Sequence, residues 1–159
     1  MNNIDWKNLP FGYMKTDYNV RCYYRDGKWG QVETSSSEEI SIHMAATCLH
    51  YGQEAFEGLK AFRCKDGKIR IFRLEENAAR LQSTCRGIMM PELPTELFRE
   101  MCIQVIKMNE RFLPPYGEGA SLYLRPLLIG TGAEGNNLAD INFWRMGEDI
   151  YTSNNKYFR

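Results

Sequence analysis

An arginine inside an apolar segment is the first candidate for a ligand-binding residue. Arg125 lies within the run 120–129, and side chains two residues apart share one face of a strand. It therefore projects together with Tyr123, while Leu122 and Leu124 face the other way. A buried guanidinium needs a partner, because an unpaired buried charge is costly. We expect Arg125 either in an internal ion pair or, beside Tyr123, in a ligand pocket.

A second arginine, Arg80, lies on the flank of a predicted amphipathic helix. Apolar residues recur there every three or four positions and form one stripe: Leu74, Ala78, Leu81 and Cys85. Arg80 lies beside this stripe, on the flank that also carries Asn77 and Thr84. In this position it either extends into solvent or binds an anion such as phosphate through paired N–H donors.

The segment 49–62 is short, aromatic and contains two glycines, Gly52 and Gly58. Generic chemistry assigns it no role. Neither His43 nor His50 has a second ligand at metal-binding spacing, and no Walker-type glycine loop is present. The sequence therefore predicts no metal site.

Two Asp-Gly dipeptides predict β-hairpins closed by type I′ turns, one at Asp26-Gly27 and one at Asp66-Gly67. A two-residue loop in the second hairpin would place four apolar side chains on one face: Phe62, Cys64, Ile69 and Ile71. Four cations would then share the other face: Arg63, Lys65, Lys68 and Arg70. We expect that face to contact water and acidic partners, or alternatively an anion.

The elements that follow are two helices and a strand. The first helix begins near Leu74, and Gly87 is placed to end it. The second has Thr95 as its expected N-cap, carries apolar residues as far as Phe112, and is stopped by two prolines. A buried strand follows at 120–129. This order predicts an α+β fold with a largely antiparallel sheet and flanking helices. No element is predicted for 133–159, where apolar residues follow no sustained period.

Length and composition are typical of one soluble globular domain. The chain has 159 residues, of which 43% are hydrophobic, and its 20 basic and 20 acidic residues cancel. Nucleic-acid binders usually carry a basic excess, and no apolar run is long enough to span a bilayer, so neither partner is expected. The five scattered cysteines are typical of reduced thiols, and no secretory signal is visible. We therefore expect a cytoplasmic protein.

The segment Tyr51-Gly52-Gln53-Glu54-Ala55-Phe56-Glu57-Gly58-Leu59-Lys60-Ala61-Phe62 closely resembles the signature of branched-chain amino-acid aminotransferases. These are pyridoxal-phosphate enzymes of fold type IV. The motifs at 9–12, 69–73 and 121–130 match the same family in the same order, so the resemblance covers about Asn8 to Gly132. It implies the small amino-terminal domain of fold type IV aminotransferases.

The resemblance also implies residue roles and a reaction. Arg80 matches the arginine that binds the 5′-phosphate of pyridoxal phosphate. Arg125 matches the arginine that receives the extra carboxylate of glutamate or 2-oxoglutarate. Aromatic residues match the walls of the pocket for branched side chains: Phe11, Tyr51, Phe56 and Tyr123. The implied reaction transfers the amino group of leucine, isoleucine or valine to 2-oxoglutarate, in a homodimer.

The family's Schiff-base lysine lies in a carboxy-terminal domain that nothing in this sequence matches. We therefore expect an aminotransferase domain at 1–132, an unmatched tail at 133–159 produced by a frameshift or truncation, and almost no activity from this chain alone. Two alternatives stay open. One is another fold type IV enzyme, such as a D-amino-acid aminotransferase or an aminodeoxychorismate lyase. The other is a non-catalytic remnant that binds a partner.

Overall fold

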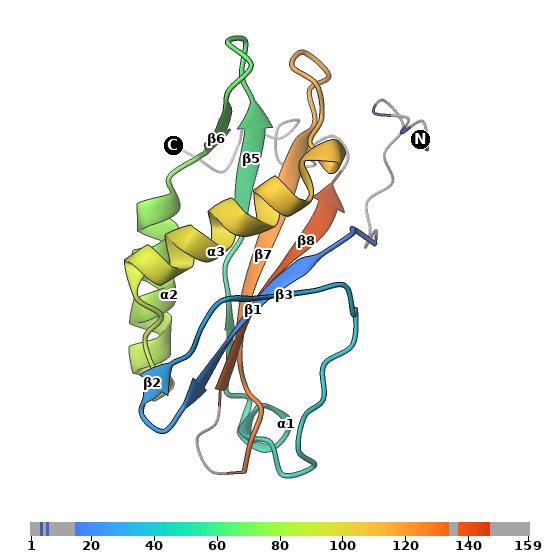
Figure 1. The fold of residues 1–159 in the computed structure, drawn as a ribbon. Helices are drawn as coiled ribbons and strands as arrows, with labels where there is room; N and C mark the ends of the chain where they lie inside the picture. Colours follow the sequence, from blue (N-terminus) through green and yellow to red (C-terminus); the bar gives the residue numbers. More distant parts are fainter. Residues whose placement is uncertain (1–3, 5, 7–14, 134–136, 147–159) are drawn as a thin grey trace.

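The computed structural model describes residues 4, 6, 15–133 and 137–146. Within them one sheet forms in the order β2-β1-β8-β7-β5-β6, with β3 also paired to β1 and β4 to β7. The helices α2 and α3 lie over one face of this sheet (Figure 1). Every strand pair is antiparallel, which confirms the predicted α+β fold.

The elements have the following bounds: β1 Asn19–Arg25, β2 Lys28–Trp29, β3 Glu33–Ser35, α1 Thr47–Tyr51, β4 Glu54–Phe56, β5 Leu59–Arg63, β6 Ile69–Ile71, α2 Leu74–Gly87, α3 Thr95–Met108, a 3-10 helix Glu110–Phe112, β7 Ser121–Gly130 and β8 Asn137–Met146. The helix predicted from Leu74 to Gly87 is confirmed. The N-cap of α3 is Pro94 and not Thr95, and α3 ends at Met108, so that Phe112 lies in the 3-10 helix.

The core lies between the sheet and the two helices. Alternate residues of β4, β5 and β7 are buried on the face toward α2 and α3, and they include Ala55, Leu59, Ala61, Leu122, Leu124 and Leu128. The helices contribute Leu81, Phe98, Met101 and Val105 to the same cluster. This alternation confirms that Leu122 and Leu124 face away from Tyr123 and Arg125.

The first predicted hairpin is confirmed and the second has a different turn. Asp26 and Gly27 both take a positive φ, as a type I′ turn requires. In the second hairpin the N–H of Gly67 donates to the carbonyl of Cys64 (2.9 Å), and Gly67 is the bulge residue of a longer turn. The register therefore pairs Arg63 with Ile69.

This change of register means that the predicted apolar face of Phe62, Cys64, Ile69 and Ile71 does not form, because Phe62 now lies opposite Arg70. The predicted face shared by four cations does not form either, because Arg63 and Arg70 now lie on opposite faces of the hairpin. Both of these arginines have acidic partners. Arg63 pairs with Glu110 (3.0 Å) and Arg70 with Asp66 (2.8 Å). The guanidinium of Arg70 lowers the pKa of Asp66 to about 2.

A strand forms where none is predicted. The backbone of β8 pairs with β7 from Gly130↔Asn137 to Ser121↔Met146, and with β1 on its other side. Without β8, the long strands β1 and β7 would each leave a row of N–H and C=O groups unpaired at an edge. Backbone pairing between two existing edges therefore specifies this strand, and side-chain periodicity does not reveal it.

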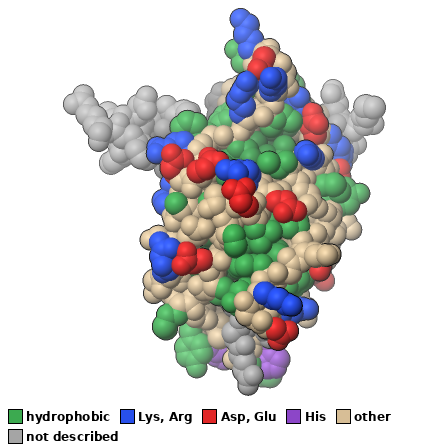
Figure 2. Space-filling view, turned by 60° about the vertical axis from the view of Figure 1, so that its left-hand side comes forward, with side chains coloured by type: hydrophobic (Ala, Val, Ile, Leu, Met, Phe, Trp, Pro, Cys, Tyr) green, Lys and Arg blue, Asp and Glu red, His purple; other side chains and the backbone are tan. Residues whose placement is uncertain are grey.

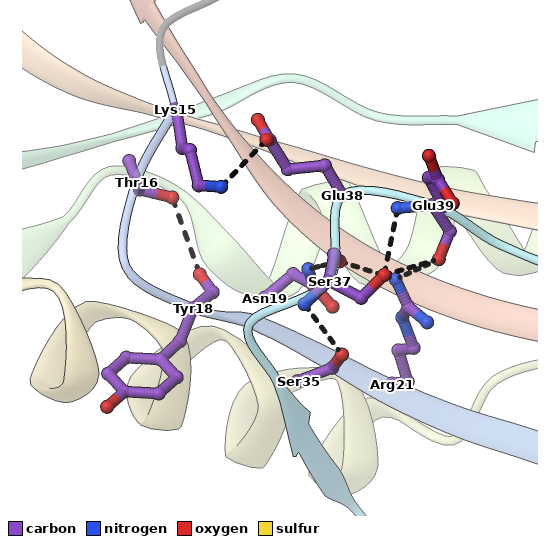
Figure 3. Close-up of polar contacts among 9 residues, drawn as sticks. All are labelled: Lys15, Thr16, Tyr18, Asn19, Arg21, Ser35, Ser37, Glu38 and Glu39. Atoms are coloured by element: carbon purple, nitrogen blue, oxygen red, sulfur yellow. Dashed lines mark hydrogen bonds and ion pairs between the residues drawn. The ribbon is translucent and has the colours of Figure 1, made fainter.

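Side chains fasten the loop after β3 against β1 (Figure 3). The buried Arg21 donates from Nη2 to the carbonyls of Ser37 (2.9 Å) and Glu39 (3.0 Å). Asn19 Nδ2 donates to the same Ser37 carbonyl (2.6 Å), and Lys15 pairs with Glu38 (3.0 Å). This loop leads to α1, so the contacts help to place the helix that carries Tyr51.

Asn109 joins the chain before β1 to the end of α3. Its fully buried side chain accepts the N–H groups of Asp17 (3.0 Å) and Tyr18 (3.1 Å) at Oδ1. Its Nδ2 donates to the carbonyls of Tyr18 (2.9 Å) and Val105 (2.8 Å). One amide therefore satisfies four backbone groups.

Replacing Asn109 with alanine should lower the free energy of unfolding by about 2–4 kcal/mol, because it leaves buried backbone groups unsatisfied. Urea denaturation of the purified chain measures this loss. Gln104→Ala on the same helix is the control, since it removes one exposed hydrogen bond to Thr34. Equal losses in the two variants would contradict this role for Asn109.

Candidate functional site

Three of the predicted site residues meet on the face of the sheet opposite the helices. Arg125 and Tyr123 lie on β7, and Phe56 lies on the neighbouring β4. The Arg125 Cζ is 4.6 Å from the centre of the Phe56 ring and 5.3 Å from that of Tyr123. The guanidinium therefore contacts two aromatic faces, which attract a cation through the ring quadrupole.

Gly58 allows Tyr123 to lie close to the backbone between β4 and β5. A Cβ built on Gly58 would overlap the Tyr123 hydroxyl and ring. No side chain fits at position 58 unless the tyrosine moves. The glycine of the signature is therefore required by a close approach of Tyr123.

Replacing Gly58 with alanine should displace the Tyr123 ring and lower the free energy of unfolding by about 1–3 kcal/mol, because the added methyl overlaps the tyrosine. Gly87→Ala is the matched control: a Cβ there meets nothing within 4 Å, and alanine is the better helix former. Adding Tyr123→Leu should recover much of the Gly58→Ala loss in a double-mutant cycle. Additive losses would mean that the two residues do not interact.

Arg80 projects from α2 and forms a bidentate ion pair with Glu57. The Arg80 Nε donates to Glu57 Oε1 (3.2 Å) and Nη2 donates to Oε2 (2.7 Å). Nη2 also donates to Asn77 Oδ1 (2.7 Å). The Glu57 side chain is 10% exposed and that of Arg80 is 60% exposed. Arg80 thus extends toward solvent, which is one of the two positions predicted from the sequence. Its inner edge is held by a buried carboxylate.

Arg80 and Tyr123 line one pocket at the edge of the sheet, with a volume of about 290 Å³. The other lining residues include two further cations, Lys60 and Arg73, and the aromatic residues Phe62 and Phe72. This pocket lies where α2 begins, next to β5. Figure 2, viewed from the side of α2 and β6, shows apolar side chains surrounded by basic and acidic ones. The lining suits an anion attached to a flat or apolar group.

The backbone at Arg73 gives the pocket a fixed rim. Arg73 takes a left-handed conformation (φ 52°), which is uncommon for a residue with a Cβ. Its carbonyl accepts the side-chain Nδ2 of Asn77 (2.8 Å), and Asn77 in turn contacts Arg80. Asn77, itself buried, thereby ties the start of α2 to the Arg80 guanidinium.

The structure does not unite all six predicted residues. Phe56, Tyr123 and Arg125 are in contact, and Arg80 shares a pocket with Tyr123. Tyr51 ends α1 with 81% of its surface exposed, and no described contact joins it to these residues. Phe11 lies outside the described residues.

Sequence reasoning missed Glu57, although the sequence carries a signal for it. Ala55, Leu59 and Ala61 alternate on one strand face, and Glu57 occupies the same face between them. A carboxylate in a period-2 apolar pattern predicts a buried acid, which needs a cationic partner.

The buried thiols are poor nucleophiles. Burial raises the pKa of the Cys22 and Cys102 thiols, and it raises that of Cys85 to about 11. Cys48 and Cys64 are only partly buried. Among the residues that the structure describes, no group of three His, Cys, Asp or Glu could hold a metal ion, and no helix could cross a membrane.

Alkylation of the folded chain at pH 8 should therefore modify Cys48 and Cys64 first. Cys22, Cys85 and Cys102 should react only after denaturation, because a raised pKa keeps the thiol protonated and burial excludes the reagent. Mass spectrometry of peptides after timed labelling gives the order. Early modification of Cys102 would contradict the burial described.

No family model matches the chain. A branched-chain-amino-acid aminotransferase of Haemophilus influenzae is 52% identical over 132 residues, which are 83% of this chain and 38% of that protein. The same enzyme of Helicobacter pylori is 48% identical over 132 residues, 83% of this chain and 39% of that protein. Branched-chain-amino-acid aminotransferase 5, chloroplastic, of Arabidopsis thaliana is 46% identical over 132 residues, which are 82% of this chain and 31% of that protein.

Solved structures agree on the fold. The branched-chain amino acid aminotransferase from Escherichia coli matches with a TM-score of 0.61 at 25% identity, over 83% of this chain and 42% of that one. The branched-chain amino acid aminotransferase from Thermobaculum terrenum, solved in its PLP form, matches with a TM-score of 0.58 at 19% identity, over 82% of this chain and 40% of that one.

The α+β fold is that of the small domain of fold type IV aminotransferases. The sequence matches place the chain among the branched-chain amino-acid aminotransferases, as an amino-terminal portion of that family's sequence. The chain spans 38–39% of the length of the two bacterial relatives.

Proposed function

We propose that this chain provides part of the cofactor and substrate pocket of a branched-chain amino-acid aminotransferase. The reaction transfers the amino group of leucine, isoleucine or valine to 2-oxoglutarate with pyridoxal phosphate. The observation that carries the proposal is the pocket that joins Arg80 to Tyr123. The identity of 46–52% to named enzymes of this family supports the reaction.

The residues present fit the phosphate of the cofactor. Arg80, Lys60 and Arg73 bring three cations to one pocket, and Glu57, the buried acid that pairs with Arg80, is not among its lining residues. A phosphate dianion is stabilised by such donors, and arginine binds it with a planar set of N–H groups. Pyridoxal phosphate, when bound, supplies the group that accepts and returns the substrate's amino nitrogen.

The cluster of Phe56, Tyr123 and Arg125, on the sheet face opposite the helices, fits the substrates. The rings of Phe56 and Tyr123 offer apolar surfaces to branched aliphatic side chains. Arg125, between these rings, would bind the carboxylate that distinguishes glutamate and 2-oxoglutarate from branched-chain substrates. From the resemblance, Phe11 and Tyr51 would add to the apolar wall.

A domain at 1–132, followed by a segment of different origin at 133–159, is part of this proposal. The two bacterial matches each cover 83% of the chain and leave the remainder unmatched, which supports a division of this kind. The Schiff-base lysine would come from the carboxy-terminal part of the enzyme. Among the lysines of this chain, Lys60 lies in β5 at a position that matches a strand residue of the family.

An apolar surface near α1 supports contact with further protein. Met44, Leu49, Tyr51 and Phe56 are all exposed, with exposed fractions of 59–84%. Large exposed apolar residues in one region mark sites of association. We assign this surface to the rest of the enzyme in a cytoplasmic homodimer. By itself the chain exposes this surface and should self-associate as its concentration rises, as a non-catalytic remnant also would.

A chimera tests the proposal directly: residues 1–132 joined to the remaining part of the Haemophilus influenzae relative. It should transaminate leucine with 2-oxoglutarate, whereas the 159-residue chain alone should not. Arg80→Lys should weaken pyridoxal phosphate binding by about tenfold or more, because a lysine lacks the planar set of donors that can hold Glu57 on one edge and contact a phosphate on the other.

Arg86→Lys is the control, since Arg86 lies on the same helix with a similar exposed fraction, 58% against 60%, and pairs with Glu92 on the surface. A folded chimera without activity, or equal effects of the two substitutions, would contradict the proposal. Glutamate production by the 159-residue chain alone would show that the lysine-bearing part is not needed.

A further inference from the structure

Glu57 is a buried carboxylate that none of the proposed roles uses. Glu57 directly follows β4 and is 9% exposed. It lies on the strand face that packs against the helices. Its N–H donates to the carbonyl of Pro126 (3.0 Å), which fixes the backbone at this position. Because a buried carboxylate is costly without a cation, Glu57 requires its partner, Arg80.

The pairing uses only one side of the arginine. Nε and Nη2 donate to Glu57, and Nη2 donates also to Asn77. Among the described residues, Nη1 is the Arg80 nitrogen without a hydrogen-bond partner. Arg80 and Asn77 line the pocket, and the carboxylate of Glu57 lies behind them, outside the lining.

We infer that Glu57 is a positioning residue: it holds the inner edge of Arg80 so that the Nη1 edge is presented to an anion in the pocket. The inference rests on the proposed function for the choice of a phosphate. Arginine has many rotamers, and ordering them on binding weakens affinity. Glu57 and Asn77 impose this order when the chain folds, before the anion arrives.

The alternative to exclude is that Glu57 weakens anion binding by Arg80. A carboxylate in contact with Arg80 also cancels its charge and could compete with the anion for its N–H groups. Positioning predicts that removal of the Glu57 charge weakens anion binding. Competition predicts that the same change strengthens it. The sign of the effect therefore separates the two.

The experiment compares Glu57→Gln with Glu54→Gln in the 159-residue chain. Both substitutions remove one negative charge from the same stretch, but Glu54 is exposed. The probes are inorganic phosphate and pyridoxamine 5′-phosphate, whose amine does not condense with lysines. Binding is followed by NMR titration. The hydrogen exchange of the Arg80 Nε–H is measured separately, with its signal assigned by its loss in Arg80→Lys.

In Glu57→Gln, the Arg80 Nε–H should exchange about fivefold faster or more, and pyridoxamine 5′-phosphate should bind about fivefold to tenfold more weakly. Glu54→Gln should leave exchange unchanged and should bind the probe equally or slightly better. Tighter binding by Glu57→Gln, or unchanged exchange, would overturn the inference.

A measurement in the unmodified chain covers the case in which Glu57→Gln does not fold. Slow rotation of the Arg80 guanidinium about Nε–Cζ supports the pairing, and rotation as fast as that of an exposed arginine overturns it. Equal phosphate binding by the unmodified chain and Arg80→Lys would refute the proposed function. The exchange comparison would still decide whether Glu57 holds Arg80.

Discussion

The site depends on the continuous register in which β4 and β5 both pair with β7. Phe56 lies opposite Leu127 and Leu59 opposite Leu124, so the two short strands share one alignment. Glu57 and Gly58 occupy the break between them, next to Pro126, which has no N–H to donate to the ladder. The break therefore follows from one proline. The two residues in the break are the buried acid, Glu57, and the glycine that accommodates Tyr123, Gly58.

This register also separates the chemistry of the two sheet faces. The described part of the face toward the helices is mostly apolar, and it buries the Glu57 carboxylate, whose charge is balanced by Arg80 from α2. The other face carries Phe56, Tyr123 and Arg125, where the rings contact the guanidinium. The residues proposed to bind the phosphate and those proposed to bind the substrates thus come from opposite layers, and Arg80 and Tyr123 meet at the edge of β5, where Gly58 provides no side chain to separate them.

Local rules predicted the elements in which one signal dominates. The stripe from Leu74 to Cys85 predicted α2 because burial of one helix face specifies it, and Asp26-Gly27 predicted a turn because both residues take a positive φ. The Asp66-Gly67 turn was wrong by one residue, since a glycine bulge competes with the type I′ turn at little difference in energy. Strand β8 was missed because its pairing with β1 and β7 is non-local.

The candidate site was predictable in part for the same reason. The shared face of Tyr123 and Arg125 follows from strand alternation alone, whereas the roles of the six site residues came from the resemblance to a family. The partner of Arg80 is separated from it by 23 residues, and no spacing rule connects a strand break to a helix flank. The position of Glu57 in an apolar alternation is a sequence signal for a buried pair, but no such pair was predicted from it.

The most direct test of this account is a crystal structure of the chimera with pyridoxamine 5′-phosphate bound. The account predicts the phosphate in the pocket beside Tyr123, within hydrogen-bond distance of Arg80 Nη1, with Glu57 still bound to Nε and Nη2. A phosphate bound away from Arg80, or an Arg80 that leaves Glu57 in order to reach it, would contradict the arrangement on which the proposed function rests.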